Sequence, residues 1–173
     1  LIRKVEGVRY ERERIDTPDG DFLDLDWYFN GGKKLILGLH GLEGDSQRPY
    51  IQGMLKLFGR HGWDGAGLNF RGCSGELNRL ARSYHIGDTG DVHFVIQHIM
   101  NNYRYDEIAL FGFSLGGNVT LKYLGERGKE LPDIIKRAVA FSVPCHIESA
   151  NYEIEKWYNR MYRNLFLSSL NAK

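Results

Sequence analysis

Apolar and polar residues follow two alternating patterns along the middle of the chain. Near-continuous apolar runs are typical of strands that are covered on both faces, and between them apolar residues recur with helical spacing. The expected strands span residues 34–40, 63–70, 107–113 and 137–143. The expected helices span residues 49–61, 91–103 and 115–127. Strands that alternate with helices of this length predict βαβ units and a mostly parallel sheet, which is the α/β class.

The residues before this region predict two further strands of a different kind. Residues 9–15 are rich in β-formers but charged, and a Pro-Asp-Gly turn at residues 17–20 leads into residues 22–28. In the second segment apolar residues alternate with Asp24 and Asp26, so we expect a half-exposed strand. Their short connection favours an antiparallel N-terminal edge of the sheet.

The last part of the chain predicts a strongly amphipathic helix with an aromatic apolar face. The apolar positions fall at helical spacing on Ile154, Trp157, Tyr158, Met161, Tyr162 and Leu165. Charged and polar side chains such as Lys156, Arg160 and Arg163 fill the other side. This helix follows the fourth parallel strand, where another βα unit would be due.

Composition and charge exclude several classes of function. The 173 residues fit one domain. The 23 basic and 22 acidic residues are interleaved and leave a net charge of +1, so we expect no nucleic-acid partner. The uncharged runs are too short to span a bilayer, and we find no secretory signal. Cys73 and Cys145 form no disulfide framework or metal-ligand pair, and no phosphate-binding glycine loop is present. We therefore expect a cytoplasmic protein with two free thiols, without cofactor or metal.

The segment Gly112-Phe113-Ser114-Leu115-Gly116 carries the candidate chemistry. It matches Gly-x-Ser-x-Gly between an expected strand and an expected helix, which is the context of a nucleophile elbow. Such a turn lifts the serine hydroxyl above the sheet, and the glycines are needed where strand and helix crowd each other. We therefore predict Ser114 as the nucleophile of a serine hydrolase.

A second segment, His40-Gly41-Leu42-Glu43-Gly44, follows the first predicted parallel strand. Acyl transfer builds negative charge on a carbonyl oxygen, which two preorganised N–H groups can stabilise. In enzymes with this elbow, one donor follows the nucleophile and the other comes from the loop after this strand. We therefore predict the amides of Leu115 and Leu42 as the oxyanion hole, and we expect His40 to shape the turn rather than to accept a proton.

The chain resembles the YheT-type branch of the α/β-hydrolase family over nearly its whole length. The resemblance rests on residues 40–44 (HGLEG), 69–75 (NFRGCSG) and 112–118 (GFSLGGN), and also on residues 17–22 (TPDGDF) and 158–160 (YNR). It implies esterase or lipase-like activity on carboxylic esters, with a small-molecule ester as the substrate. It also implies a helical cap after the fourth parallel strand, so we expect a core at residues 1–147 and the beginning of a cap at residues 148–173.

The resemblance identifies no counterpart in this chain for the acid and the histidine of the family's catalytic triad. In this fold both follow the serine, and His146 is the one histidine after Ser114. His146 as a substitute base and Glu148 as the acid stay open as alternatives, although a histidine in a cap loop fits the position better. Arg71 could bind an acidic group or serve in packing. A non-catalytic hydrolase-like module for binding, and a thioesterase or peptidase, are the alternative functions.

The resemblance also places the last strands of the fold outside these 173 residues. We therefore expect the strand near residues 138–143 to present an unpaired edge and the apolar helix to lose part of its cover. Both features predict self-association through the exposed strand edge. They also predict near-background ester turnover by the 173 residues alone, because Ser114 then has no base.

Overall fold

The computed structural model describes residues 4–170 and contains one six-stranded sheet. Its strands lie in the order β1-β2-β4-β3-β5-β6. They are β1 (Glu11–Asp16), β2 (Phe22–Tyr28), β3 (Lys34–Leu39), β4 (Asp64–Asn69), β5 (Glu107–Phe113) and β6 (Ile135–Phe141). Strands β4, β3, β5 and β6 are parallel, whereas β2 is antiparallel to both β1 and β4. The predicted α/β class with an antiparallel N-terminal edge is therefore confirmed.

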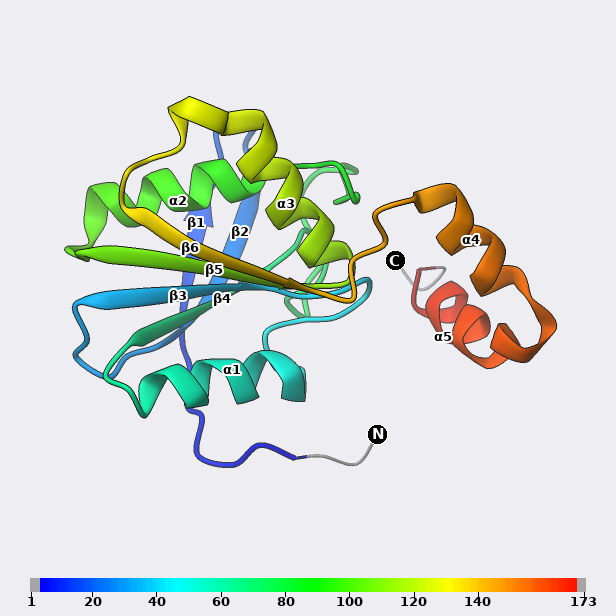
Figure 1. Cartoon of the computed structure of the whole chain (residues 1–173), viewed down its shortest axis with the longest axis horizontal. Helices are drawn as coiled ribbons and strands as arrows, with labels where there is room; N and C mark the ends of the chain where they lie inside the picture. Colours follow the sequence, from blue (N-terminus) through cyan, green and yellow to red (C-terminus); the bar gives the residue numbers. More distant parts are fainter. Residues whose placement is uncertain (1–3, 171–173) are drawn as a thin grey trace.

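Helices cover both faces of this sheet, as Figure 1 shows. Helix α1 (Pro49–Gly59) lies on one face, and α2 (Gly90–Asn102) and α3 (Leu115–Arg127) lie on the other. A short 3-10 helix, η1 (Gly128–Glu130), follows α3. The parallel strands point the same way, so the loops that leave β3, β5 and β6 meet at one edge of the sheet.

The two faces of the sheet bury separate apolar clusters. Leu37 and Leu110 pack with Val95 of α2 and Val119 of α3 in the larger cluster, and all four side chains are at most 1% exposed. On the opposite face, Ile36 and Phe111 pack with α1 through buried residues at helical spacing, Ile51 and Leu55. Each apolar side chain buried in this way contributes about 1.5–3 kcal/mol relative to an exposed one. The strand ends that carry the candidate site therefore rest on packing from both sides.

Strand β2 differs from the half-exposed strand that its alternation predicts. Asp24 and Asp26 are each 1% exposed rather than solvated. Arg14 of β1 binds Asp24 through two hydrogen bonds of 2.8 and 2.9 Å, and Arg12 binds Asp26 in the same way at 2.7 and 2.8 Å. The expectation of a solvated Asp face was wrong because the charged β1 supplies guanidinium partners that make burial of both carboxylates tolerable.

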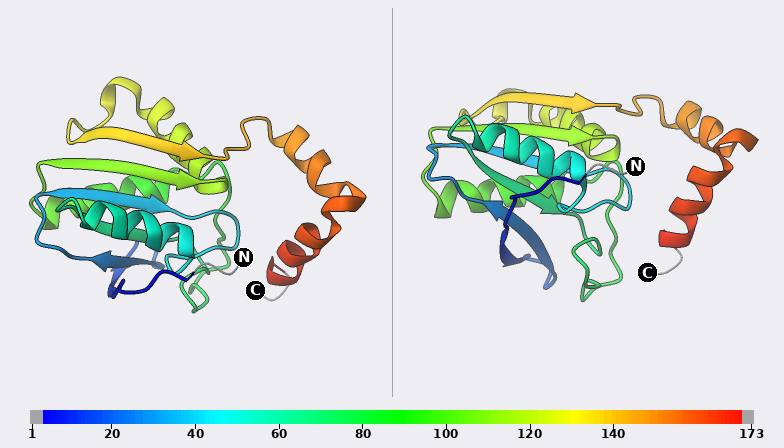
Figure 2. Two further views of the ribbon diagram at one scale, coloured as in Figure 1. Left: turned by 60° about the horizontal axis from the view of Figure 1, so that its bottom comes forward. Right: turned by 90° about the horizontal axis from the view of Figure 1, so that it is seen from below.

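The residues after β6 form a C-terminal arm, which we define as residues 147–170. It consists of α4 (Ile147–Glu155), the 3-10 helix η2 (Trp157–Asn159) and α5 (Arg160–Leu170). The predicted single amphipathic helix was wrong, because Lys156 has extended backbone angles (φ −60°, ψ 144°) and ends α4. The Asn159 side chain donates to the Glu153 carbonyl at 2.7 Å and so stabilises the corner. Figure 2 shows the arm leaving the end of β6 and turning back beside the loop edge of the sheet.

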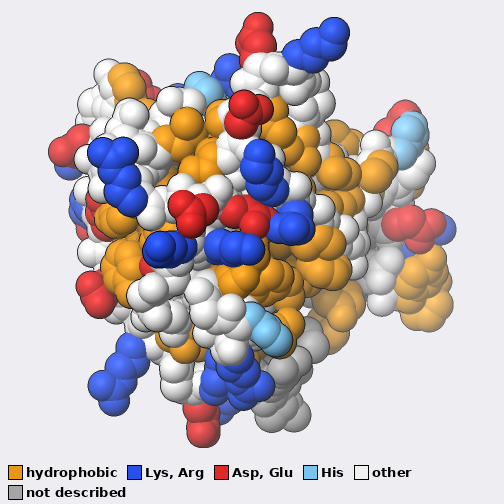
Figure 3. Space-filling model, turned by 60° about the vertical axis from the view of Figure 1, so that its left-hand side comes forward, with side chains coloured by type: hydrophobic (Ala, Val, Ile, Leu, Met, Phe, Trp, Pro, Cys, Tyr) orange, Lys and Arg blue, Asp and Glu red, His pale blue; other side chains and the backbone are white. Residues whose placement is uncertain are grey.

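The surface agrees with the mixed charge of the sequence. Figure 3 shows one face of the molecule, on which basic side chains lie between acidic ones rather than in a patch of one sign. Across residues 4–170, none of the helices has both the length and the apolar character that crossing a bilayer requires. Neither Cys73 nor Cys145 takes part in a disulfide bond.

Candidate active site

Ser114 occupies the sharp turn between β5 and α3. Its backbone has φ +53° and ψ −117°, a conformation that non-glycine residues rarely adopt. Holding a residue there costs about 1–3 kcal/mol, which the surrounding structure must offset. The turn is fixed from both sides, because the Ser114 N–H donates to the Phe141 carbonyl of β6 at 2.8 Å and Asn118 N–H donates to the Ser114 carbonyl at 3.0 Å.

The glycines around Ser114 make this turn sterically possible. A Cβ on Gly112 would lie 2.3 Å from the Gly116 carbonyl oxygen, and a Cβ on Gly116 would lie 2.3 Å from the Leu39 carbonyl oxygen. A Cβ on Gly117 would lie 2.8 Å from a Val143 methyl. The backbones of β5, α3 and the end of β3 therefore lie so close together that only glycine fits at these positions.

The loop after β3 forms a tight turn beside this elbow. Gly44 N–H donates to the Gly41 carbonyl at 3.0 Å, which places Leu42 and Glu43 at the two central positions of a β-turn. Glu43 has φ +51°, in the left-handed region. The loop touches the elbow directly, since a Cβ on Gly41 would lie 3.4 Å from the Ser114 Cβ.

His40 fixes the peptide that carries the Leu42 amide. It is fully buried, and its Nε2 accepts from the Phe70 N–H at 3.1 Å, so its Nδ1 carries the proton and donates to the Gly41 carbonyl at 2.7 Å. The Gly41 carbonyl thus has two donors, His40 and Gly44. In a trans peptide the Leu42 N–H points away from that carbonyl and from both donors. The expectation that His40 shapes the turn agrees with this geometry.

A cavity of 690 Å³ lies over Ser114 and the loop after β3. One wall consists of residues 41–44 with Arg48 and Tyr50, and the floor contains Phe113 and Ser114. Ser142 lines the cavity after β6, and α5 covers it with Tyr162, Leu165, Phe166 and Ser168. The structure therefore brings Ser114 and Leu42 to one cavity, and Leu115 follows Ser114 as the first residue of α3.

Sequence comparison with known families agrees with this architecture. The α/β hydrolase fold family matches residues 34–172, which is most of the chain. The chain belongs to the α/β-hydrolase family. Known relatives of this α/β-hydrolase include the candidate esterase YheT of Escherichia coli (strain K12), 37% identical over 164 residues. Phospholipase ABHD3 of Homo sapiens is 32% identical over 178 residues.

The match to these relatives covers most of this chain but only part of theirs. It spans 92% of this chain and 48% of YheT, and 98% of this chain and 43% of the human phospholipase. Among solved structures, the esterase Pf2001 of Pyrococcus furiosus superposes with a TM-score of 0.76 at 21% identity, over 94% of this chain and 62% of that one. The chain therefore spans about half the length of the curated relatives it matches.

A buried polar network supports the loop after β3. The Ser46 hydroxyl donates to Asp26, and the Ser46 N–H donates to the Asn69 side-chain oxygen at 2.9 Å. Asn69 also donates to Asp26 at 2.9 Å. Burial raises the pKa of Asp26, but hydrogen bonds from Arg12, Ser46 and Asn69 outweigh that effect and hold it below its usual range. The alternating Asp residues of β2 were the sequence signal for this network, which the sequence interpretation missed.

Arg71 belongs to a structural cluster rather than to the cavity. Its side chain is 1% exposed and binds Asp91 at 2.7 Å and Asp21 at 2.9 Å. Asp19 lies 3.1 Å away, and hydrogen bonding by the Thr17 hydroxyl together with the charge of Arg71 lowers the pKa of Asp19 to about 2. This cluster ties the turn after β1 to the loop after β4 and to α2, so packing is the role that the geometry gives to Arg71.

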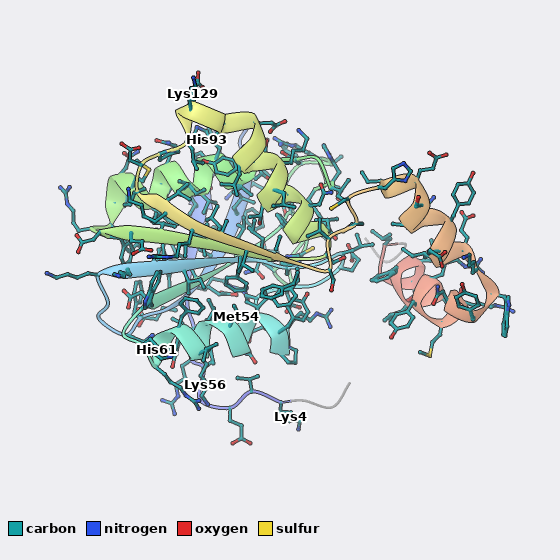
Figure 4. All side chains as sticks on the ribbon, viewed as in Figure 1. Lys4, Met54, Lys56, His61, His93 and Lys129 are labelled. Atoms are coloured by element: carbon teal, nitrogen blue, oxygen red, sulfur yellow. The ribbon has the colours of Figure 1, made fainter. Side chains whose placement is uncertain are left out.

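No histidine lines the Ser114 cavity among residues 4–170. His146 is exposed and caps α4, where its Nδ1 accepts from the Ser149 N–H at 3.2 Å, and Glu148 is exposed in the first turn of the same helix. His93 faces Tyr123 of α3 at 3.3 Å, and Figure 4 places it above the sheet, away from the arm. Within the same residues, no cluster of His, Cys, Asp and Glu is arranged to hold a metal ion.

Proposed function

We propose that this α/β-hydrolase cleaves carboxylic esters through an acyl intermediate on Ser114. The observation that carries the proposal is the strained Ser114 turn, with φ +53°, at the floor of a 690 Å³ cavity. Strain of this kind clusters at functional sites, and at the turn between β5 and α3 it leaves the Ser114 side chain exposed at the loop edge of the sheet. Family membership and the names of the relatives, a phospholipase and an esterase, support the same chemistry.

In the proposed reaction, the Ser114 oxygen attacks the ester carbonyl carbon and its proton passes to a base. The carbonyl oxygen gains the displaced electron pair, and the amides of Leu42 and Leu115 donate to it. Collapse of this intermediate breaks the bond to the leaving oxygen, which takes up the proton and departs as an alcohol. Water then releases the acid from Ser114. Each oxyanion donor of this kind contributes about 2.7–4 kcal/mol to transition-state stabilisation.

The cavity walls favour an ester with an apolar group on the side of the arm. Tyr162, Leu165 and Phe166 of α5 face the cavity, whereas Arg48 and Glu43 lie at the loop after β3. An acyl or alkyl chain would displace water from the apolar side, and burial of each CH₂ is worth about 0.8 kcal/mol. We therefore propose a small-molecule ester substrate, and no cofactor enters the reaction.

Labelling with a fluorophosphonate probe tests this function, because only an activated serine reacts. The protein produced from its complete reading frame should be labelled on Ser114, and Ser114→Ala should abolish labelling. Ser142→Ala is a matched control, since Ser142 lines the same cavity and also has a positive φ of 52°. This variant should still be labelled.

An unlabelled wild-type protein with intact fold would contradict the proposal and favour a non-catalytic binding module. Oxygen esters, thioesters and peptides of matched acyl groups then separate the hydrolase subclasses. The proposal requires the oxygen esters to be turned over fastest.

A further inference from the structure

Tyr84 contacts the loop after β3 from a distant part of the sequence. It lies in the segment between β4 and α2, and its side chain is 8% exposed. Its ring stacks on Phe70, with centroids 5.3 Å apart and planes 8° apart, and it meets the His40 ring edge-on. The aromatic contacts hold the Tyr84 hydroxyl at the turn that contains Leu42.

The Tyr84 hydroxyl makes two hydrogen bonds to one residue of that turn. It accepts from the Glu43 N–H at 2.8 Å and donates to the Glu43 Oε1 at 2.7 Å. A phenol can act as donor and acceptor at once, so it satisfies both the backbone and the side chain of Glu43. The Arg48 guanidinium adds a third contact, donating to the Glu43 carbonyl at 2.8 Å.

These contacts hold Glu43 in a conformation that a glutamate does not prefer. A positive φ at the third position of a β-turn defines type II geometry, which favours glycine or asparagine there. Without the Tyr84 hydroxyl, the buried Glu43 N–H would lose this partner and the peptide between Leu42 and Glu43 could rotate toward the commoner type I turn. Such a rotation would move Leu42, the residue before Glu43.

We propose that Tyr84, acting through Glu43, is a positioning residue that sets the Leu42 amide for oxyanion stabilisation. The inference rests on the proposed function, because it assigns a role in the same reaction. His40 fixes the carbonyl side of the peptide before Leu42, and Tyr84 fixes the peptide after it. Misplacement of a catalytic group by about 1 Å can cost about a hundredfold in rate, so a contact outside the reacting atoms can control turnover.

The test compares Tyr84→Phe with wild type in the protein produced from its complete reading frame. This change removes one oxygen and keeps the ring stack on Phe70. We expect kcat for a 4-nitrophenyl ester to fall by about ten- to a hundredfold with KM within about twofold, since the loss concerns the transition state. The inhibition constant of a trifluoromethyl ketone of the same acyl chain, which forms an oxyanion on binding to serine, should rise by the same factor.

Two changes at Glu43 keep the test decisive if Tyr84→Phe does not fold. Glu43→Leu removes the acceptor of the Tyr84 hydroxyl without touching the aromatic stack, and it should lower kcat and ketone affinity together. Glu43→Gln keeps an acceptor oxygen and should recover most of both. A purely structural role would lower the unfolding midpoint in urea without this parallel change in the two constants.

Tyr105→Phe is the matched control. The Tyr105 hydroxyl also donates to a carboxylate, Asp64 Oδ2, at 2.9 Å, but Asp64 begins β4 at the opposite end of the strands from Ser114. Tyr105→Phe should therefore leave kcat and ketone affinity unchanged. Wild-type kcat in Tyr84→Phe, or a lower kcat with unchanged ketone affinity, would overturn the inference. A wild-type protein without ester turnover would instead refute the proposed function itself.

Discussion

The Ser114 elbow and the C-terminal arm line the same cavity, but they are built in opposite ways. At the elbow, backbone meets backbone so closely that added Cβ atoms on Gly112 and Gly116 would lie 2.3 Å from carbonyl oxygens. On the arm, large apolar side chains face solvent, with Trp157 84% and Met161 75% exposed. Of the apolar arm residues that line the cavity, Tyr162 is 50% and Leu165 is 64% exposed, and Phe166 is half-buried.

This difference separates two kinds of contribution to one site. Close backbone packing can fix a residue in a strained conformation, which the proposed role of Ser114 as the nucleophile requires. A lightly packed helix pair can line a cavity but contributes little to stability, because it buries few apolar side chains. We therefore expect substitutions in the sheet and elbow to change the free energy of unfolding, and equivalent substitutions in the arm to leave it nearly unchanged.

The largest expected difference is between two tryptophans. Trp27 of β2 is 1% exposed, stacks on Phe29 at 5.1 Å and donates to Glu13 at 2.8 Å. Trp27→Ala should lower the free energy of unfolding by about 3–5 kcal/mol. Trp157→Ala, on the arm, should change it by less than about 0.5 kcal/mol. Urea unfolding followed by circular dichroism measures both, and equal losses would show that the arm is packed as firmly as the sheet.

The next difference is between two glycines of the same helix, α3. Gly116→Ala forces a Cβ against the carbonyl oxygens of Leu39 and His40 and should destabilise the protein by about 1–3 kcal/mol or more. Gly125→Ala meets nothing within 4 Å and should stabilise it by about 0.5–1 kcal/mol. Thermal unfolding of the two variants measures their changes in melting temperature. Changes of the same sign would contradict this account.

A smaller effect is expected on the dependence of stability on pH. The pKa of Asp19 is lowered to about 2 in the folded protein, so its contribution is present above the unfolded value near 4 and is lost as pH falls toward 2. Asp19→Asn should therefore flatten the fall of the urea midpoint between about pH 4 and pH 2. Glu153→Gln on the arm should change that slope much less, because the Lys156 contact that lowers the pKa of Glu153 lies in solvent and is screened.

The smallest effect concerns self-association, which we propose occurs through the edge of β6. Val139 on this edge strand is 41% exposed, but Lys136 and Arg137 are exposed beside it and charges weaken edge-to-edge pairing. For the 173-residue polypeptide we expect weak dimers by size-exclusion chromatography with light scattering. Val139→Lys should shift them to monomers. Association that persists in this variant would point to the apolar face of the arm instead.

Much of the sheet and elbow could be predicted from the sequence, because local pattern and packing agree there. The predicted bounds 22–28, 107–113 and 115–127 coincide with β2, β5 and α3. Long-range polar pairing could not be predicted. The burial of Asp26 depends on Arg12, Ser46 and Asn69, and nothing local to residue 84 indicates that its hydroxyl meets Glu43.

The arm was predicted least well for a related physical reason. Its apolar spacing fits one continuous helix, but spacing alone does not show whether a face is buried, and burial is what keeps a long helix intact. The break at Lys156 is instead stabilised locally, by Asn159 and Glu153. Sequence pattern is therefore most informative where a segment is packed on several sides.

The central claim, an acyl intermediate on Ser114, is tested most directly by trapping that intermediate. The protein from its complete reading frame would be mixed with an excess of a 4-nitrophenyl ester, quenched in acid within one turnover, and digested for mass spectrometry. The account predicts that the peptide containing Ser114 gains the mass of the acyl group and that Ser114→Ala does not gain it. Ester turnover with the acyl group on another residue, or undiminished turnover by Ser114→Ala, would contradict the account.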